Sequence, residues 1–582
     1  MSSTVSQNGS GAGQKGLKKN ALGLLGSVVI GTASTAPAYS LAASLGFIVA
    51  SGGSLLAGVK APGIMLIAFV PMFLIAIAYK EMNQAEPDCG TTFTWATRAF
   101  GSITGWMGGW GIIIADIICM SNLAQIAGAY SFTFVGQITG NQAISDLAKD
   151  TTWSTVAGVI WILLMTYICY RGIEVSARMQ YALLGIELII LLVFAVYALF
   201  RVYTGQAESY SLTPQLDWFN PFTLDFGSII APAILTALFI YWGWDTAVSV
   251  NEETKDPAKT SGRAAIISTV LLLVTYLLVS TAAVAFAGTG TQGIGLGNPD
   301  NSGDVFLAIG PQLFGNSPLG TVFLVLLSAS VLTSAAASTQ TTILPTARTA
   351  LSMAAYKAIP TKFASIHKKY LTPSWSTWGM GIISVVFYLV FTMISSSLLL
   401  ALIGSIGLMI AFYYGLTGFA ATWYYRRTIF RSVRNFFMRG LFPTLGGLML
   451  LAAFIYGLQQ FLLPDWLTDD NGDNVTIFGL GAVGVVGLMA LAVGVVLMVI
   501  WWIIKPDFFR GKTLSRRTHI LVLDEATGLE KVSVFGAPDA GAERDVIAPD
   551  LSNLPTGAVA IDTVTGEKVT RRSLREAEND KK

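Results

Sequence analysis

The chain has 582 residues, of which 53% are hydrophobic and 12% are charged, and its formal net charge is +2. Soluble domains carry about 25% charged residues, so this composition excludes a soluble globular protein and indicates a protein that crosses a bilayer many times. A net charge this small offers no basic surface for nucleic acid, which excludes that class of partner.

Apolar stretches of about 20 residues, the length that crosses a bilayer, recur between residues 20 and 505. The sequence therefore predicts an all-α membrane protein with about twelve transmembrane helices. We expect them near residues 21–50, 61–79, 102–134, 153–170, 180–202, 228–249, 264–288, 317–342, 374–395, 397–424, 441–463 and 476–504.

The two ends of the chain are polar. We expect residues 1–19, rich in Gly and Ser, to be a disordered cytoplasmic N-terminus. Residues 506–582 are expected to form a cytoplasmic tail that is mostly disordered or weakly structured. Within this tail, the pieces from His519 to Phe535 and from Ala558 to Val569 alternate weakly, as strands do.

Lysine and arginine are divided unevenly between the two sides of the predicted helices. If the N-terminus is cytoplasmic, the inner loops hold most of them, and the outer loops hold only Lys60, Lys149 and Arg201. An excess of positive charge marks cytoplasmic loops. The sequence thus predicts a multi-pass protein of the plasma membrane with both termini in the cytoplasm.

Two of the predicted spans contain residues that interrupt a helix. In the first, Pro37 removes a backbone donor and its ring clashes with the preceding turn. In the sixth, a glycine and a carboxylate lie between large aromatic residues. Paired interruptions in corresponding positions of two halves are typical of inverted-repeat transporters, whose substrate binds where the backbone opens. A simple kink in each of two packed helices is the alternative.

We therefore predict a substrate site made from both interruptions. The first contributes Gly31, Thr32, Ala33, Ser34, Thr35 and the nearby Tyr39, and the second contributes Tyr241, Trp242, Gly243 and Asp245. The aromatic rings of this set are suited to closing over a substrate or stacking on an ammonium group.

Three carboxylates lie inside apolar spans: Asp116 in the third, Glu187 in the fifth and Asp245 in the sixth. A charged carboxylate at the bilayer centre costs about 2.5 kcal/mol or more, so each needs a cavity, a partner or a proton. We expect Asp116 and Asp245 to bind substrate. Glu187, alone in an aliphatic run, is expected to carry a proton or to hold a coupling ion. For each acid, the alternative is a protonated group bonded to a neighbouring helix.

Several segments resemble the amino acid–polyamine–organocation superfamily of transporters, over roughly residues 20–505. They are Tyr79 to Asn83 with Pro87 to Trp95, Phe100 to Trp106, Arg171 to Gln180, Asn251 to Pro257, and Arg348 to Pro360 with His367 and Pro373. The resemblance implies a LeuT-like five-plus-five inverted-repeat core, with repeats at about 21–202 and 228–424 and two extra helices at about 441–504. It also implies secondary transport, with substrate held between the interruptions of spans one and six.

The sequence departs from the family in two places that bear on the site. By the resemblance, the run from Ile30 to Thr35 occupies the segment that cradles an amino acid carboxylate, but Ala33 replaces its second glycine. Glu187 stands where many members have lysine. A fixed cation there would mimic bound sodium, which an acid cannot do.

The leading prediction is a secondary active transporter that takes up an amino acid or a related amine, coupled to H⁺ or possibly to Na⁺. A neutral or cationic amino acid needs a carboxylate cradle at Gly31 to Thr35, whereas a diamine would use the separate acids Asp116 and Asp245. A potassium carrier on the same fold and a sensor that signals through its tail are the alternatives. The sequence carries no nucleotide motif, metal-ligand cluster or nucleophile–base pair, so we expect no catalytic site, metal or cofactor.

Overall fold

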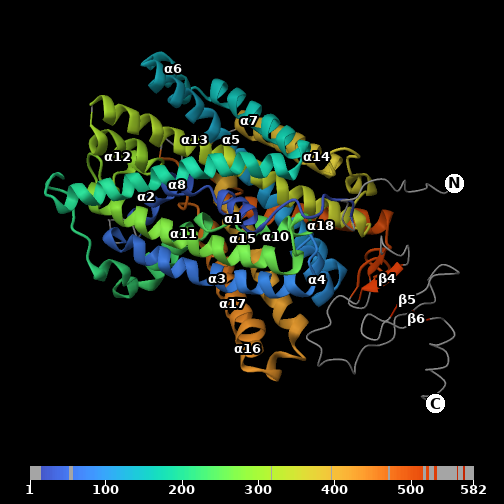
Figure 1. Cartoon of the computed structure of the whole chain (residues 1–582). Helices are drawn as coiled ribbons and strands as arrows, with labels where there is room; N and C mark the ends of the chain where they lie inside the picture. The colour runs from blue at the N-terminus through green and yellow to red at the C-terminus, as the bar shows by residue number, and fades with distance from the viewer. Residues whose placement is uncertain are drawn as a thin grey trace.

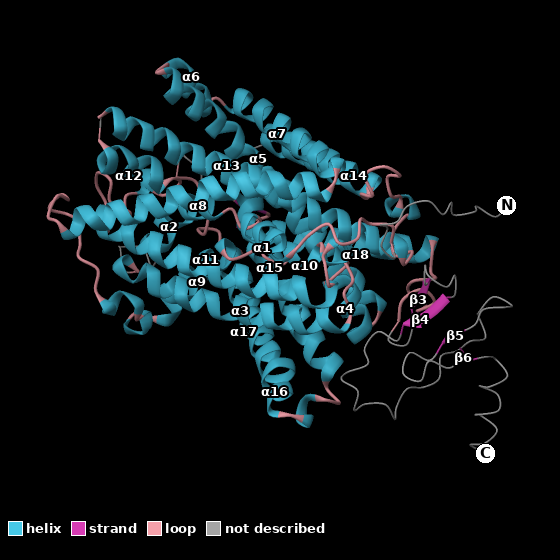
Figure 2. Ribbon diagram, viewed as in Figure 1, coloured by secondary structure: helices cyan, strands magenta, loops and turns pink. Residues whose placement is uncertain are grey.

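The structure is a computed structural model, and it describes residues 15–51, 57–315, 317–394, 396–468 and 472–515, with four short strands between residues 520 and 569. Helices dominate it, and the long ones run side by side through one bundle (Figure 1, Figure 2). Among the described residues, eleven helices are long and apolar enough to cross a membrane. The predicted all-α membrane class is confirmed.

The long helices follow the predicted spans in chain order. They are α1 Leu24–Ala33 with α2 Pro37–Ala50, α3 Ala61–Ala85, α5 Ser102–Thr139, α7 Thr151–Arg171, α8 Ile173–Tyr203, α11 Pro257–Ala287, α13 Pro318–Ala355, α14 Ser374–Ile394, α15 Ser396–Tyr425, α17 Phe442–Phe461 and α18 Ala482–Ile504.

Shorter elements join these helices. The short α-helices are α4 Thr92–Phe100, α6 Gln142–Asp146, α9 Ala231–Ile240, α10 Thr246–Ser249, α12 Val305–Phe314 and α16 Val433–Asn435. Two π-helical turns, Phe226–Ile230 and Phe436–Leu441, lead into α9 and α17. An antiparallel pair, β1 Thr476–Ile477 and β2 Leu480–Gly481, precedes α18.

The predicted sixth span, 228–249, is divided in two. Residues 226–240 form one apolar helical piece and α10 forms another, with residues 241–245 between them in a turn conformation. Neither piece is long enough to cross a bilayer, which needs about 20 helical residues. This division accounts for eleven long helices where the sequence predicts about twelve spans. The five-plus-five repeat stays a prediction.

Glycines allow the closest helix crossings. Where α5 crosses α7, a Cβ added to Gly158 would lie 2.6 Å from the carbonyl oxygen of Ala124. Small residues let backbones approach in this way when lipid supplies no hydrophobic drive between helices. α5 also packs along α13, and α3 packs along α11, so helices from both halves of the sequence surround the two interrupted ones.

One end of the bundle, called here the Lys15 face, holds residues 15–22, the α3–α4 link, α4 and residues 506–515. α12 and α6 lie at the opposite end, the α12 face (Figure 1). Leu17 is fully buried, and Phe508 stacks on Phe93 with ring centroids 5.4 Å apart. The structure describes residues 15–19 and 506–515, and apolar side chains in both segments pack onto the bundle.

Most of the expected disorder, in residues 1–14 and in most of 516–582, falls outside the described residues. Two hairpins of the tail are described. β3 Ile520–Leu523 pairs with β4 Glu530–Ser533, and β5 Ala560–Ile561 pairs with β6 Lys568–Val569, both antiparallel. These strands lie within the two pieces of the tail that alternate in the sequence.

Candidate functional site

The two interrupted helices meet where each one opens. Between α1 and α2, Ala36 has a φ of +47°, in the left-handed region. Between α9 and α10, Gly243 has a φ of +117°. The hydroxyl oxygens of Ser34 and Thr246 lie 2.9 Å apart and join one opening to the other. The two predicted interruptions thus exist, and they face each other.

Gly243 is required by its conformation and by its neighbour. Side chains other than that of glycine rarely adopt a φ of +117°. A Cβ at this position would also lie 2.7 Å from the carbonyl oxygen of Ser34. Gly31 is comparably close to the second interrupted helix, because a Cβ there would lie 3.0 Å from that of Ala247. Glycines therefore bring the two helices together on both sides of the openings.

Hydroxyl groups satisfy the carbonyls that the openings release. Ser338 on α13 donates to the carbonyl of Ser34 at 2.9 Å. Tyr276 on α11 donates to the carbonyl of Ile240, the last residue of α9, at 2.6 Å. An unsatisfied backbone group in a bilayer costs several kcal/mol, so these two side chains stabilise the interrupted state of the helices.

Glu187 lies at the start of α2. Its Oε1 accepts hydrogen bonds from the backbone N–H of Ala38 at 2.7 Å and from the hydroxyl of Ser334 at 2.8 Å. The N–H of Tyr39 donates to the same Ser334 oxygen at 3.2 Å. Glu187 is fully buried, and its Oε2 has no partner among the described residues. An acid from α8 thus occupies the partially positive end of α2.

Asp245 lies on the other side of the openings, before α10. Its two oxygens accept hydrogen bonds from two consecutive tyrosines of α15, from Tyr414 at 2.8 Å and from Tyr413 at 3.2 Å. The indole N–H of Trp242 donates to the Tyr413 hydroxyl. Asp245 is therefore held by two tyrosines, one of which is held in turn by Trp242.

Asp116 on α5 is the third buried acid, and it accepts a hydrogen bond of 2.5 Å from the hydroxyl of Thr346 on α13. Asp116 and Asp245 are close enough to interact electrostatically. In the part of the chain that the structure describes, neither acid has a lysine or arginine partner. Among the described residues, the side-chain hydrogen-bond partners of these two carboxylates are all neutral hydroxyls.

The predicted aromatic residues surround this centre. Trp244 packs between Tyr79 and Tyr414, with ring centroids 5.2 and 5.1 Å away, and Tyr241 packs edge-on against Tyr276 at 5.1 Å. The Tyr39 hydroxyl donates to the side chain of Asn122. Of the predicted residues, Gly31, Thr32 and Ala33 lie in the last turns of α1 and not in the opening itself.

Sequence reasoning missed several residues of the site. They are Tyr79, Asn122, Tyr276, Ser334, Ser338, Thr346, Tyr413 and Tyr414. The adjacent tyrosines at 413 and 414, inside an otherwise apolar span, were the one visible signal. The rest are ordinary hydroxyl, amide and aromatic residues of membrane helices, and only the packing of those helices brings them to the site.

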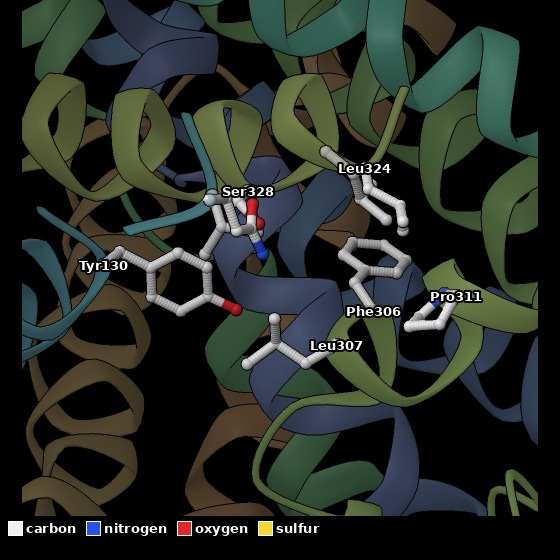
Figure 3. Close-up of a pocket in the computed structure, with 9 residues that line it drawn as sticks. Tyr130, Phe306, Leu307, Pro311, Leu324 and Ser328 are labelled. Carbon is white, nitrogen blue, oxygen red and sulfur yellow. The ribbon is translucent and has the colours of Figure 1, made fainter. Parts of the chain in front are cut away.

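A cavity of about 70 Å³ lies toward the α12 face, at the ends of α5 and α13 (Figure 3). Its lining includes Tyr130 and Gln137 of α5, Phe306 of α12 and Ser328 of α13. The Tyr130 hydroxyl and one oxygen of Gln137 are buried without partners among the described residues. This mostly apolar cavity is lined in part by the same two helices that carry Asp116 and Thr346 deeper in the bundle.

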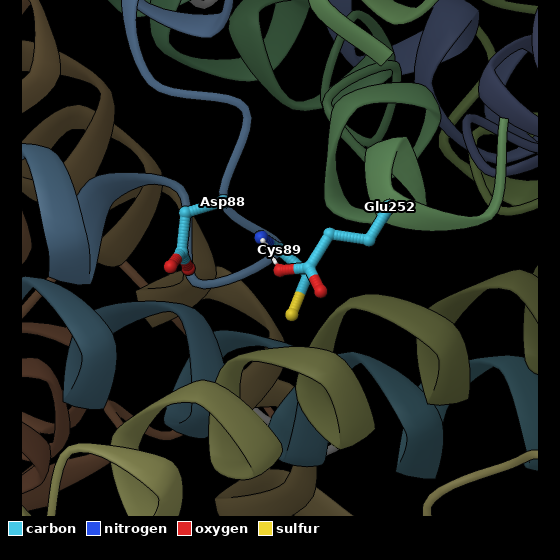
Figure 4. A group of neighbouring side chains, drawn as sticks. All are labelled: Asp88, Cys89 and Glu252. Atoms are coloured by element: carbon cyan, nitrogen blue, oxygen red, sulfur yellow. Dashed lines mark hydrogen bonds between the residues drawn. The ribbon is translucent and has the colours of Figure 1, made fainter. Parts of the chain in front are cut away.

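At the Lys15 face, a buried charge cluster lies beyond the end of α10 (Figure 4). The Lys15 ammonium contacts Asp88 at 2.7 Å and Glu252 at 2.6 Å, and it lies 3.7 Å from the sulfur of Cys89. Burial alone would raise the pKa of Asp88, but the Lys15 ion pair and the N–H of Gly90 hold that pKa at about 2. Asp88, Cys89 and Glu252 are spaced as metal ligands are, yet the lysine already fills the position of a cation.

Comparison with known proteins gives a consistent family. The sequence profile of the amino acid permease family matches residues 22–485. The chain is similar to the branched-chain amino acid permease BcaP of Bacillus subtilis, with 23% identity over 355 residues that cover 58% of this chain and 69% of that protein. It is also similar to the methylthioribose transporter of Bacillus subtilis, with 24% identity over 334 residues, covering 55% of this chain and 65% of that protein. The solved structure of MhsT in complex with L-phenylalanine aligns with a TM-score of 0.49 and 14% identity, over 74% of this chain and 98% of that one.

Proposed function

The chain belongs to the amino acid permease family, and from that premise we propose that it is a proton-coupled secondary active transporter that takes up an amino acid or a related amine. It is a multi-pass membrane transporter and not an enzyme. We place it in the plasma membrane with the Lys15 face in the cytoplasm, because the lysines and arginines of the sequence gather on that side.

One observation carries the proposal: two interrupted helices face each other through Ser34 and Thr246. Backbone openings in the middle of a bundle concentrate polar groups where a solute can be held at equal distance from both surfaces. The carboxylates of Asp116 and Asp245 can supply negative charge beside the openings, and in the described part of the chain neither has a lysine or arginine partner. A solute that carries an ammonium group would neutralise the charge of these carboxylates.

Proton coupling is supported by the position of Glu187. One of its oxygens holds Ala38 and Ser334, and so joins α8 to α2 and α13. The other oxygen is free to receive a proton without breaking these bonds. Neutralising the carboxylate weakens its attraction to the start of α2, because the helix dipole favours a negative charge there. A proton on Glu187 thus loosens the same contact that fixes the opened segment.

The test is uptake by purified protein in liposomes. A screen of radiolabelled amino acids and amines would be run under an imposed proton gradient, a sodium gradient and no gradient, with protein-free liposomes as the control. We expect accumulation of an amino acid or amine above equilibrium only with the proton gradient. Accumulation driven by the sodium gradient alone would identify Na⁺, and not H⁺, as the coupling ion. Absence of gradient-driven accumulation of every solute would contradict the transport function, and flux of potassium alone would favour the potassium carrier.

A further inference from the structure

We propose that residues 426–441, between α15 and α17, bind an anionic phospholipid in the leaflet at the Lys15 face, which we place in the cytoplasm. This segment, called here the arginine loop, contains five arginines and no aspartate or glutamate. Its short helix α16 projects from the bundle beside α17, at the lower edge of the view in Figure 1. The proposed site lies outside the two openings and does not depend on which solute is transported.

Two of the five arginines hold the loop against the bundle. Arg439 is buried, and its Nε lies 2.7 Å from a carboxylate oxygen of Glu81, near the end of α3. Arg434 also pairs with Glu81. The guanidinium of Arg439 lies over the ring of Tyr425, the last residue of α15, at 4.4 Å from its centroid. Glu81 and Tyr425 thus give the loop a defined position at the ends of α3 and α15.

The other three arginines leave a surplus of positive charge at the surface. Arg426, Arg427 and Arg431 are exposed, and none has an ion-pair partner in the part of the chain that the structure describes. Arg426 lies over the ring of Trp423, at 4.7 Å from its centroid. A guanidinium group presents paired N–H donors that match the oxygens of a phosphate. The exposed side of the loop therefore suits a phosphate group.

Large apolar side chains stand beside these arginines. Phe430 is 84% exposed and Val433 is 78% exposed. The ring of Phe430 contacts that of Phe436, which contacts that of Phe437, with centroids 6.1 and 5.3 Å apart. These four residues form one apolar ridge. Apolar and aromatic residues mixed with arginines are typical of a segment that lies in the interface of a membrane.

The apolar ridge continues the exposed side of α17. Phe437 packs on Phe442, the first residue of α17, with centroids 5.6 Å apart. Exposed residues then follow at intervals of three or four, which places them on one face of the helix: Leu445, Leu448, Leu451 and Ile455. Such a face of a membrane helix contacts acyl chains. The ridge is therefore placed where α17 leaves the acyl chains, and the arginines are placed among the headgroups.

An anionic phospholipid matches both parts of this surface. Its phosphate complements the arginines, and its acyl chains cover the ridge. A soluble anion would leave the ridge in water, and a zwitterionic lipid brings a positive group of its own among the arginines. Basic segments at the membrane surface are attracted to anionic lipids for this reason. Bound lipid would stabilise the ends of α3, α15 and α17, which the loop joins.

The test follows thermal unfolding of the purified full-length protein in detergent as lipid is added. It compares phosphatidylglycerol, phosphatidylcholine with the same acyl chains, and soluble glycerol 3-phosphate. We expect phosphatidylglycerol to raise the melting temperature at about tenfold lower concentration than phosphatidylcholine, and glycerol 3-phosphate to have no effect. Equal effects of the two lipids would overturn the proposal. An equal shift with glycerol 3-phosphate would assign the loop to a soluble anion and overturn the lipid. Neither result bears on transport, because no uptake is measured.

Two double variants locate the charge effect. Arg427→Gln with Arg431→Gln removes two exposed charges from the loop. Lys368→Gln with Lys369→Gln removes the same charge from another exposed segment, next to Ile366, which packs on Gly16. We expect the arginine variant to need about tenfold more phosphatidylglycerol for the same shift, and the lysine variant to respond as wild type does. The melting temperature in phosphatidylcholine alone shows that each is folded. Equal responses of the two variants would overturn the site.

A further pair of variants tests the apolar ridge. Phe430→Ser removes its most exposed ring, and Phe222→Ser removes a ring that is 74% exposed in the segment before α9. We expect Phe430→Ser to need about tenfold more phosphatidylglycerol for the same shift, and Phe222→Ser to change nothing. An unchanged response in Phe430→Ser would show that the ridge does not contact acyl chains, and would overturn a phospholipid as the occupant.

Discussion

The carboxylate of Glu187 accepts a hydrogen bond from the backbone N–H of Ala38 across 2.7 Å, so an acid of α8 holds the first turn of α2. Side-chain acceptors commonly cap the start of a helix, but they usually belong to the residue just before it. Here the cap comes from α8, which begins at residue 173, 136 residues after α2 begins at residue 37. The charge of Glu187 therefore affects the contact between α8 and α2.

Replacing Glu187 by glutamine should separate coupled transport from exchange. Glu187→Gln keeps the acceptor for Ala38 but cannot release a proton. We expect proton-driven accumulation to fall by about tenfold or more, equivalent to about 1.4 kcal/mol, while exchange of internal for external solute changes little. Both rates are measured in liposomes, with Glu208→Gln in an exposed loop as the control. Equal loss of accumulation and exchange would count against a proton-carrier role.

Adding a methyl group at Gly243 should push the two openings apart. Gly243→Ala combines a φ of +117° with a Cβ 2.7 Å from the carbonyl oxygen of Ser34. We expect a loss of about 1–3 kcal/mol in stability and most of the transport activity. Gly185→Ala on α8 is the matched control, since no heavy atom lies within 4 Å of its Cβ. Thermal unfolding in detergent measures both, and similar melting temperatures would contradict the close contact of the openings.

Removing the charge of Asp245 should weaken substrate binding. A hydrogen bond to a charged group contributes about 1.5–3 kcal/mol, so we expect Asp245→Asn to lose roughly ten- to hundredfold in affinity. Equilibrium binding of the transported solute to purified protein measures the change. Asp300→Asn, in an exposed turn near the α12 face, serves as the control. An unchanged affinity in Asp245→Asn would exclude Asp245 from the site.

Loss of the Lys15 ammonium should open the Lys15 face. Lys15 is 12% exposed and contacts Asp88 and Glu252, whereas Lys18 is 40% exposed and pairs with Glu174. Leaving buried charges without a partner costs about 3–5 kcal/mol, and an exposed pair contributes at most about 1 kcal/mol. We expect Lys15→Met, but not Lys18→Met, to lower the melting temperature.

Chemical labelling of Cys89 measures the exposure of the Lys15 face directly. It is fully buried 3.7 Å from the Lys15 ammonium, and burial raises the pKa of its thiol well above the ordinary value. In a background with Cys119→Ser and Cys169→Ser, we expect a maleimide to label Cys89 faster in Lys15→Met than in Lys18→Met. Equal labelling would show that the N-terminal segment does not close this face.

Asp304 should make stability depend on pH near neutrality. It caps α12 by accepting the N–H groups of Phe306 and Leu307, each at 3.1 Å, and burial raises its pKa to about 7. Because the folded pKa lies above the unfolded value of about 4, the folded state favours the protonated acid and loses stability as pH rises between these values. We expect Asp304→Asn, which keeps a capping side chain, to flatten the fall in melting temperature from pH 5 to pH 7. The same slope in wild type and variant would contradict this assignment.

The parts of the fold that depend on local chemistry were predictable. Pro37 cannot donate within a helix and Gly243 admits a positive φ, so both interruptions could be located from the sequence. The partners of the buried acids could not. Tyr414 reaches Asp245 and Thr346 reaches Asp116 across 169 and 230 residues of chain. Such contacts follow from how helices pack, and one apolar span looks much like another in a sequence.

The ends of the chain illustrate the same limit. The segments 15–19 and 506–515 are polar enough to read as disordered, yet Lys15 and Phe508 are held by groups on the α3–α4 link and on α4. Among the described residues, the acids that balance the charge of Lys15 lie 73 and 237 positions away. The packing of these two segments onto the bundle could not be predicted from their composition.

The distances along the chain between the two openings also bear on how the protein is made. Thr246, the partner of Ser34, follows it by 212 residues and is therefore synthesised later. At about 5–20 residues per second, the first opened helix lies in the bilayer for roughly 10–40 seconds before its counterpart emerges from the ribosome. Glu187, which accepts the Ala38 N–H in the folded chain, is synthesised earlier, 149 residues after Ala38. The acid that we assign to proton coupling is thus available to this amide before the second opening has been made.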